Sequence, residues 1–120
     1  MSEHNDLGKR GEKLAAEHLL KKGYNILKQN YVFGKAEVDI VARINDKLVF
    51  VEVKTRDSDY LTDPVLLVPM RKQKQIIKAA DAYVKEHDLD LESRFDIIIL
   101  VSNKERTKLD HLEDAFYPTV

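Results

Sequence analysis

The chain has 120 residues, of which 43% are hydrophobic and 34% are charged, and its 20 basic and 21 acidic residues leave a net charge of −1. This length allows a single domain over residues 1–120 whose hydrophobic core needs no disulfides. The absence of cysteine excludes zinc fingers, iron–sulfur clusters and thiol chemistry. The near-neutral charge gives no support to a protein that coats nucleic acid non-specifically.

The chain has no apolar segment of the length that a membrane requires. Its longest uninterrupted apolar run is 97–101, far short of the roughly 20 residues of a membrane helix. Residues 1–6 are polar and acidic, unlike a signal peptide. We therefore expect a cytoplasmic protein without a membrane partner.

The first half of the chain predicts one helix followed by three strands. Residues 5–22 place their charged side chains on one arc of a helix, except for Glu12, which falls within the apolar arc. Three segments then either alternate between apolar and other side chains or are rich in aromatic and β-branched residues, as strands are. These segments are 24–33, 37–44 and 47–55.

The second half predicts one helix and two strands. Residues 56–68 are expected to form a loop, and Pro69 suits the first turn of a helix that ends near His87. Residues 95–101 are typical of a strand that is covered on both faces, and a short strand follows near 108–112. The order α-β-β-β-α-β-β favours an α/β fold, in which a central mixed sheet is flanked by helices.

Asn45 and Asp46 both tolerate positive φ and predict a two-residue hairpin turn between the second and third strands. This turn fixes the register of the hairpin, so that Asp39 faces Glu52 and Glu37 faces Lys54. Facing Cβ atoms lie about 4.5–5.5 Å apart. Two carboxylates at about 5 Å repel each other by roughly 3 kcal/mol at an effective dielectric constant of 20.

Protonation of one acid, a bridging cationic side chain or a divalent cation could relieve this repulsion. Hard oxygen ligands for Mg²⁺ are available from Asp39, Glu52 and the backbone carbonyl of Val53, and from Glu12 if its helix packs over this face. Lys54 lies on the same face, where an ammonium can hold a water and offset charge that grows on a phosphoryl oxygen. Together with a metal that polarises the phosphate, these groups suit attack of water on a phosphodiester.

Basic residues near this constellation are candidate contacts for nucleic-acid phosphates. Arg71 and Lys72 lie in the first turn of the second helix, and Arg56 follows Lys54 by two residues. A solvated start of the helix is the alternative interpretation of Arg71 and Lys72. We expect Glu37 to be structural or to lie outside the direct metal ligands.

A simpler interpretation of the acids stays open as well. Asp39 and Glu52 are then solvent-exposed acids satisfied by surface ion pairs, which contribute little stability. Glu12 is then the edge of an amphipathic helix.

The pattern Asp39…Glu52-Val53-Lys54 resembles the PD-(D/E)XK nuclease signature, in which a hairpin supplies two acids and a lysine. Beyond that pattern, nearly the whole chain resembles the YraN-like family of small bacterial proteins. The matching stretches are Gly8…Gly11-Glu12…Ala15-Ala16, Gly23-Tyr24, residues 35–42, residues 49–56, Pro64, Lys72…Ala79-Ala80…Tyr83, Arg94-Phe95-Asp96 and His111…Ala115-Phe116.

The YraN-like family is similar to archaeal Holliday-junction resolvases. The resemblance therefore implies a restriction-endonuclease-like fold and an endonuclease that hydrolyses DNA with Mg²⁺ or Mn²⁺, with branched or junction DNA as the favoured substrate. It also implies Glu12, Asp39, Glu52 and Lys54 as the active-site set.

The sequence departs from these patterns at two positions. Ala36 stands where the family usually has Gly, and Val38 stands where the nuclease signature has Pro. Neither change removes a ligand.

Two other classes of function stay open. A non-catalytic module that binds nucleic acid or a protein partner on the same fold would agree with the near-neutral charge, and a structural or assembly protein would have no nucleic-acid partner. An enzyme that acts on two strands would favour a two-fold homodimer. Tyr60, Leu61 and residues 65–68 are candidates for that surface.

Overall fold

The computed structural model describes residues 3–56, 68–102 and 106–118. Within these residues the chain forms two helices and five strands in the order that the sequence predicts. The elements are α1 (Glu3–Lys21), β1 (Asn25–Phe33), β2 (Ala36–Ile44), β3 (Lys47–Arg56), α2 (Met70–Glu86), β4 (Glu92–Ser102) and β5 (Thr107–Phe116).

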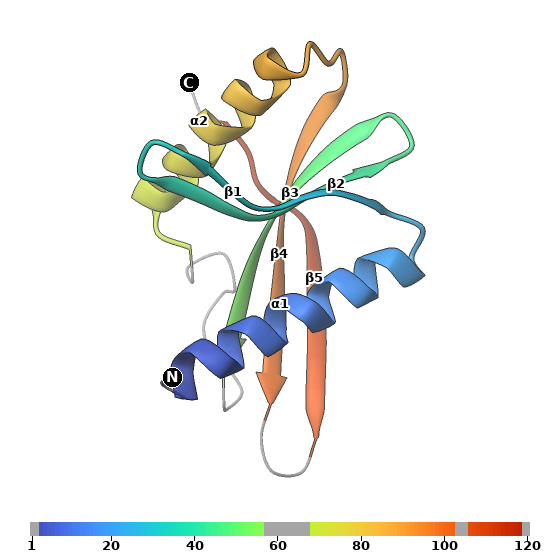
Figure 1. Ribbon diagram of the computed structural model, residues 1–120, viewed down its shortest axis with the longest axis vertical. Coiled ribbons are helices and arrows are strands. Elements are labelled where there is room, and N and C mark those ends of the chain that lie inside the picture. Colours follow the sequence, from blue (N-terminus) through green and yellow to red (C-terminus); the bar gives the residue numbers. More distant parts are fainter. Residues whose placement is uncertain (1–2, 57–67, 103–105, 119–120) are drawn as a thin grey trace.

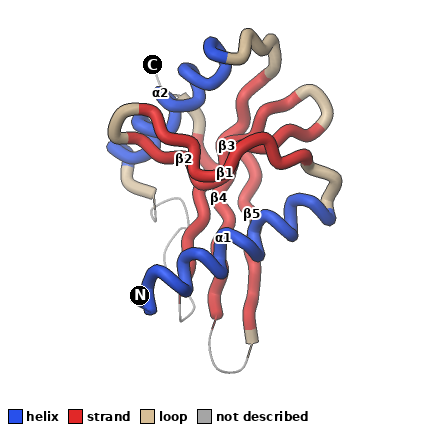
Figure 2. Tube along the Cα trace, in the orientation of Figure 1, coloured by secondary structure: helices blue, strands red, loops and turns tan. Residues whose placement is uncertain are grey.

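The five strands form one sheet whose spatial order, β1-β2-β3-β4-β5, is the order along the chain. The β3–β4 pair is parallel and the other three pairs are antiparallel, so the sheet is mixed. Figures 1 and 2 show α1 crossing the sheet, with α2 beside the tip of the β1–β2 hairpin. The predicted α/β class is confirmed, and this arrangement is compatible with a restriction-endonuclease-like fold.

The two helices cover opposite faces of the sheet, and each face has its own apolar cluster. Ile76 and Tyr83 of α2 pack with Phe50 of β3 and Ile97 of β4. On the α1 side, the cluster comprises Ala15, Ala16, Leu19, Tyr24, Ile40, Ala42, Val49, Val51, Ile98 and Leu100. Side chains of β4 alternate between the two clusters, which explains why the run 97–101 is apolar throughout.

Residues with positive φ end α1 and close the hairpins. Gly23 has φ 91° directly after α1, where the N–H of Tyr24 donates to the carbonyl of Leu19. Asn45 has φ 53° in the predicted turn between β2 and β3. The predicted register of this hairpin is confirmed from the Ile44–Lys47 pair to the Ile40–Val51 pair.

A buried polar network joins the elements on the α1 side. Asp96 is 0% exposed and accepts hydrogen bonds from Arg94 at 2.8 and 2.9 Å. It also accepts one from Nε2 of His111 at 2.7 Å and one from the backbone N–H of Asp114 at 3.0 Å. Nδ1 of His111 lies 3.1 Å from Nε2 of His18, so the network connects β4 and β5 to α1.

The structure differs from the predicted elements at several points. The final strand, predicted near 108–112, extends over Thr107–Phe116, and β4 is longer than 95–101 at both ends. Val68, a candidate for a dimer surface, is only 1% exposed because it packs in the α2-side core. The other candidates for that surface lie outside the described residues. None of the described helices has the length and hydrophobicity needed to cross a membrane.

Candidate metal centre

The site lies where β2 and β3 part. Their ladder ends at the Ile40–Val51 pair, whereas β3 stays paired with β4 as far as Arg56. Beyond the last pair, Oδ2 of Asp39 accepts a hydrogen bond from the backbone N–H of Val53 at 2.7 Å. The Asp39 carboxylate is therefore held in position by the neighbouring strand.

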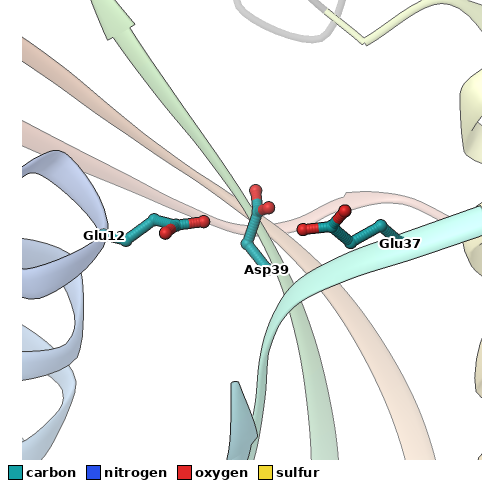
Figure 3. A group of neighbouring side chains, drawn as sticks. All are labelled: Glu12, Glu37 and Asp39. Atoms are coloured by element: carbon teal, nitrogen blue, oxygen red, sulfur yellow. The ribbon is translucent and has the colours of Figure 1, made fainter. Parts of the chain in front are cut away.

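Three carboxylates gather at this point. Glu12 of α1 and Glu37 and Asp39 of β2 each offer an oxygen atom, and these atoms all lie within 4.8 Å of one another. Figure 3 shows the Glu12 and Glu37 side chains approaching Asp39 from opposite sides. Glu12 and Asp39 are half-buried and Glu37 is exposed. We call these three residues the acidic cluster.

Close packing of α1 on β3 brings Glu12 to the cluster. Gly11, the preceding residue, is buried against Thr55, and a Cβ at this position would overlap with Oγ1 of Thr55. Glycine therefore lets the helix approach the strand more closely than a residue with a side chain would allow.

Glu52 adds a fourth carboxylate, which is almost completely buried at 4% exposure. Burial is the main reason that its pKa is raised to about 8, and its hydrogen bond with Asp39 and the negative charge of Asp39 raise it further. Nζ of Lys72 lies 3.1 Å from Oε2 of Glu52. This ion pair does not have hydrogen-bond geometry, and Oε2 is a buried oxygen without a hydrogen-bond partner among the described residues.

The pKa of Glu12 is raised to about 7. Partial burial is the largest cause, followed by the charge of Asp39, a hydrogen bond with Asp39 and the charge of Glu37. Protons on Glu12 and Glu52 therefore reduce the repulsion among the acids when no metal is present.

The two lysines at the site respond differently to their surroundings. Burial lowers the pKa of Lys54, and the neighbouring charges of Lys72 and Arg56 lower it further, against the opposing effect of Glu52. For Lys72, burial also lowers the pKa, but the negative charges of Glu52 and Asp39 outweigh burial and raise it. Lys72 is therefore held as an ammonium when Glu52 is ionised.

The charges of these side chains sum to the charge that a divalent cation would neutralise. Once all four carboxylates are ionised, they and the ammonium groups of Lys54 and Lys72 carry two net negative charges. The oxygen donors are the ligand type that Mg²⁺ and Mn²⁺ prefer. The buried Oε2 of Glu52 has no hydrogen-bond partner among the described residues, and Lys72 at 3.1 Å offsets its charge.

Asn30 is a member of the site that sequence reasoning missed. It has φ 54° in β1, between residues that pair with Ile40 and Val38, which places it opposite Asp39. With its amide nitrogen turned to the carboxylates, Asn30 donates to Oε1 of Glu12 at 3.3 Å and to Oε1 of Glu37 at 3.1 Å. The sequence did contain a signal, an asparagine within a segment of strand residues. Asparagine tolerates positive φ better than most residues, so its presence there indicates an irregular backbone.

The structure brings Asp39, Glu12, Glu52 and Lys54 to one place, as the proposed set requires. The acids that lie nearest to one another differ from those that the sequence predicted. Glu37, expected at the periphery, lies within the acidic cluster, whereas Glu52 lies beside Asp39 and is paired with Lys72.

The remaining candidates occupy other positions. The N–H of Val53 binds Asp39, and its carbonyl as a metal ligand stays a prediction. Lys72, predicted to contact phosphate, is bound to Glu52. Arg71 is exposed, and Arg56, also exposed, donates a hydrogen bond to the carbonyl of Thr55.

Similar proteins cover almost the whole chain. A UPF0102 protein of Flavobacterium psychrophilum is 51% identical over 117 residues, which is 98% of both chains. UPF0102 proteins of Christiangramia forsetii and Phocaeicola vulgatus are 48% and 44% identical, over 98% and 100% of this chain and 98% and 99% of their own. Residues 11–100, which include every residue of the site, match the description "Uncharacterised protein family UPF0102". The chain therefore belongs to the uncharacterised protein family UPF0102.

Proposed function

We propose that the protein is a divalent-metal-dependent endonuclease that hydrolyses phosphodiester bonds in DNA. The observation that carries this proposal is the convergence of Glu12, Glu37 and Asp39 within 4.8 Å, next to the buried Glu52. The half-buried Lys54 lies within electrostatic range of both Glu52 and Asp39. Without a metal, this clustering of acids would not stabilise the protein, because burial and mutual repulsion disfavour the charged forms of the carboxyl groups.

Asp39, Glu12 and Glu52 are the side chains that would hold Mg²⁺ or Mn²⁺, with Glu37 as a further donor. A bound divalent cation lowers the pKa of water and polarises a phosphoryl oxygen. Asp39 is preorganised for binding because the Val53 N–H fixes its second oxygen. Glu12 and Glu52 would release the protons favoured by their raised pKa values when the cation binds.

Lys54 supplies the remaining chemistry. Its ammonium can orient the attacking water and stabilise negative charge that develops on the phosphoryl oxygens. Lys72 pairs with Glu52 and would offset its charge, so that the ammonium of Lys54 stays available to the substrate. The acids, the lysine and their hairpin resemble the PD-(D/E)XK nuclease pattern. The resemblance of the chain to the YraN-like family, which is similar to archaeal Holliday-junction resolvases, favours branched or junction DNA.

The metal site can be tested without a substrate. Millimolar Mg²⁺ or Mn²⁺ should raise the melting temperature of the wild-type protein by mass action. Asp39→Asn should be more stable than the wild type without metal, because the amide oxygen can still accept from Val53 while the negative charge is lost. The variant should show no metal response.

Asp46→Asn is the matched control, because Asp46 is an exposed acid at the other end of the same hairpin. It should keep the full metal response. An Asp39→Asn variant that is less stable than the wild type without metal, even if it is indifferent to metal, would contradict the proposed site. So would one that still responds to Mn²⁺.

Cleavage tests the proposed activity. Linear, nicked, branched and single-stranded DNA should be incubated with Mg²⁺ or Mn²⁺ and, in parallel, with a chelator. We expect metal-dependent cleavage that is lost in Asp39→Ala and Lys54→Ala. DNA binding without cleavage of any substrate would instead support a non-catalytic binding module.

A further inference from the structure

We infer that cations on the outer face of α2, continued by the tip of the β1–β2 hairpin, bind the phosphate backbone of duplex DNA beside the acidic cluster. We call Arg71, Lys74, Lys78 and Lys35 the basic row. This inference rests on the proposed function and deepens it, because it names the surface that holds the substrate.

Three members of the basic row share one face of α2. Arg71, Lys74 and Lys78 follow the spacing i, i+3, i+7, which aligns side chains along a helix. All three are exposed, whereas the opposite face of α2 is buried in the core through Ile76 and Ala80. The sequence has no acidic residue between positions 70 and 80. The first acid after this stretch, Asp81, lies about one turn beyond Lys78 and is paired with Lys85 at 2.8 Å.

The fourth member comes from the hairpin. Lys78 and Gln75 of α2 line a hollow of about 230 Å³ together with Lys35 and Phe33 of the hairpin. A second hollow of about 390 Å³ is lined by Arg71, Lys74, Gln75 and Lys78. The two hollows share Gln75 and Lys78, so the row is continuous from the helix to the hairpin tip, which Figure 1 shows beside α2.

The placement of the charges is unfavourable for the helix itself. The first turn of α2 has no acid and the residue before it, Pro69, makes no side-chain cap. Cations here oppose the positive end of the helix dipole, which favours anions. A bound phosphate would relieve this repulsion and accept from the uncapped N–H groups.

The basic row lies next to acidic residues of the site at both ends. Lys72, adjacent to Arg71, reaches across to Glu52, and Glu37 is two residues from Lys35. Positions 71 and 78 are separated by about 10 Å along the helix axis at 1.5 Å per residue. This span matches about three nucleotides of one strand at 3.4 Å per step. A regular polyanion such as DNA therefore fits the row.

The test measures binding of a short DNA duplex in the presence of EDTA, so that cleavage does not interfere. The variant Lys35→Gln, Lys74→Gln, Lys78→Gln should reduce the slope of log affinity against log salt by about 2.7, at 0.9 for each lost phosphate contact. Between 50 and 200 mM salt, the affinity of the wild type should therefore fall about 40-fold more than that of the variant.

The control variant is Lys13→Gln, Lys21→Gln, Lys22→Gln, which removes the same charge from exposed positions of α1 and the residue after it. It should keep the wild-type slope. Equal slopes for the wild type and the basic-row variant, equal losses in both variants, or no duplex binding by the wild type at low salt would each overturn the inference.

The rise in melting temperature with Mn²⁺ verifies that the basic-row variant is folded and keeps its metal site. If the wild type binds duplex DNA through the row but never cleaves it, the proposed nuclease activity fails while the docking surface stands. If Asp39→Asn abolishes cleavage while the basic-row variant binds like the wild type, the docking surface fails alone.

Discussion

Glu52 has different proton affinities in the unfolded and the folded chain, because burial beside Asp39 raises its pKa from the ordinary value of 4.5 to about 8. Between these two values the folded protein binds more protons than the unfolded chain, so the free energy of unfolding falls as the pH rises. We expect the metal-free wild type to lose stability relative to Glu52→Gln from pH 5 to pH 8, with a slope approaching 1.4 kcal/mol per pH unit. Urea denaturation across this range measures the difference.

Comparison of the wild type with Glu52→Gln cancels the contributions that titratable groups common to both proteins make to the pH dependence of stability. His18 has a pKa lowered by burial and by His111, so it contributes a pH dependence of the opposite sign below its ordinary value. Because both proteins contain His18, its effect cancels. A stability difference that stays constant across the range would show that the environment of Glu52 does not hold its proton.

The acids of the site come from α1, β2 and β3, and the sequence predicted only part of their arrangement. The turn at Asn45 predicted the register correctly as far as the Ile40–Val51 pair, but the ladder ends before the predicted Asp39–Glu52 and Glu37–Lys54 pairs. Asp39 still lies close enough to Glu52 to raise its pKa. Asn30 depends on an irregular backbone in β1, and the Lys72–Glu52 pair depends on how α2 docks. Neither can be derived from local patterns.

At the scale of elements, the contact between α1 and β3 sets the position of Glu12. Gly11→Ala adds a methyl group that would overlap with Oγ1 of Thr55, so we expect a lower melting temperature and a weaker metal response. Replacing Thr55 by Ala in the same chain removes the obstructing oxygen and should restore much of the stability. Thermal denaturation of the two single variants and the double variant measures the coupling.

Gly8→Ala is the control for helix propensity. No atom lies within 4 Å of a Cβ added at Gly8, so this change should stabilise α1 by about 0.5–1 kcal/mol. If Gly11→Ala stabilises the protein as much as Gly8→Ala, the close approach of helix and strand does not constrain the site.

Element types were predictable because the hydrophobic periods of helices and strands differ and Gly23, Asn45 and Pro69 mark boundaries. The length of β5 was underestimated because its polar residues resemble a loop. Its pairing with β4 and the bonds from His111 and the Asp114 backbone to Asp96 hold it in the sheet.

At the scale of the whole molecule, Asp96 holds together parts that are distant in sequence. Its partners Arg94 and His111 lie on β4 and β5, and His111 contacts His18 of α1. Asp96→Asn leaves the guanidinium of Arg94 without its buried counter-charge, and loss of one partner in such a pair costs about 3–5 kcal/mol. Chemical denaturation should show this loss.

Glu113→Gln is the matched control, because Glu113 also pairs with Arg94, at 3.1 Å, but its side chain is 58% exposed. An exposed ion pair contributes about 0–1 kcal/mol. Equal losses for the two variants would show that Asp96 does not anchor the network.

The agreement between strand order and chain order has a consequence for how the protein acquires its fold. The β1–β2, β2–β3 and β4–β5 hairpins join neighbouring segments, which need little loop-closure entropy and form early. Only the parallel contact, in which Lys47 lies opposite Glu92, requires the chain to return over a long segment. We therefore expect the β1–β2–β3 meander and the β4–β5 hairpin to assemble quickly, and their union along β3 and β4 to limit the folding rate.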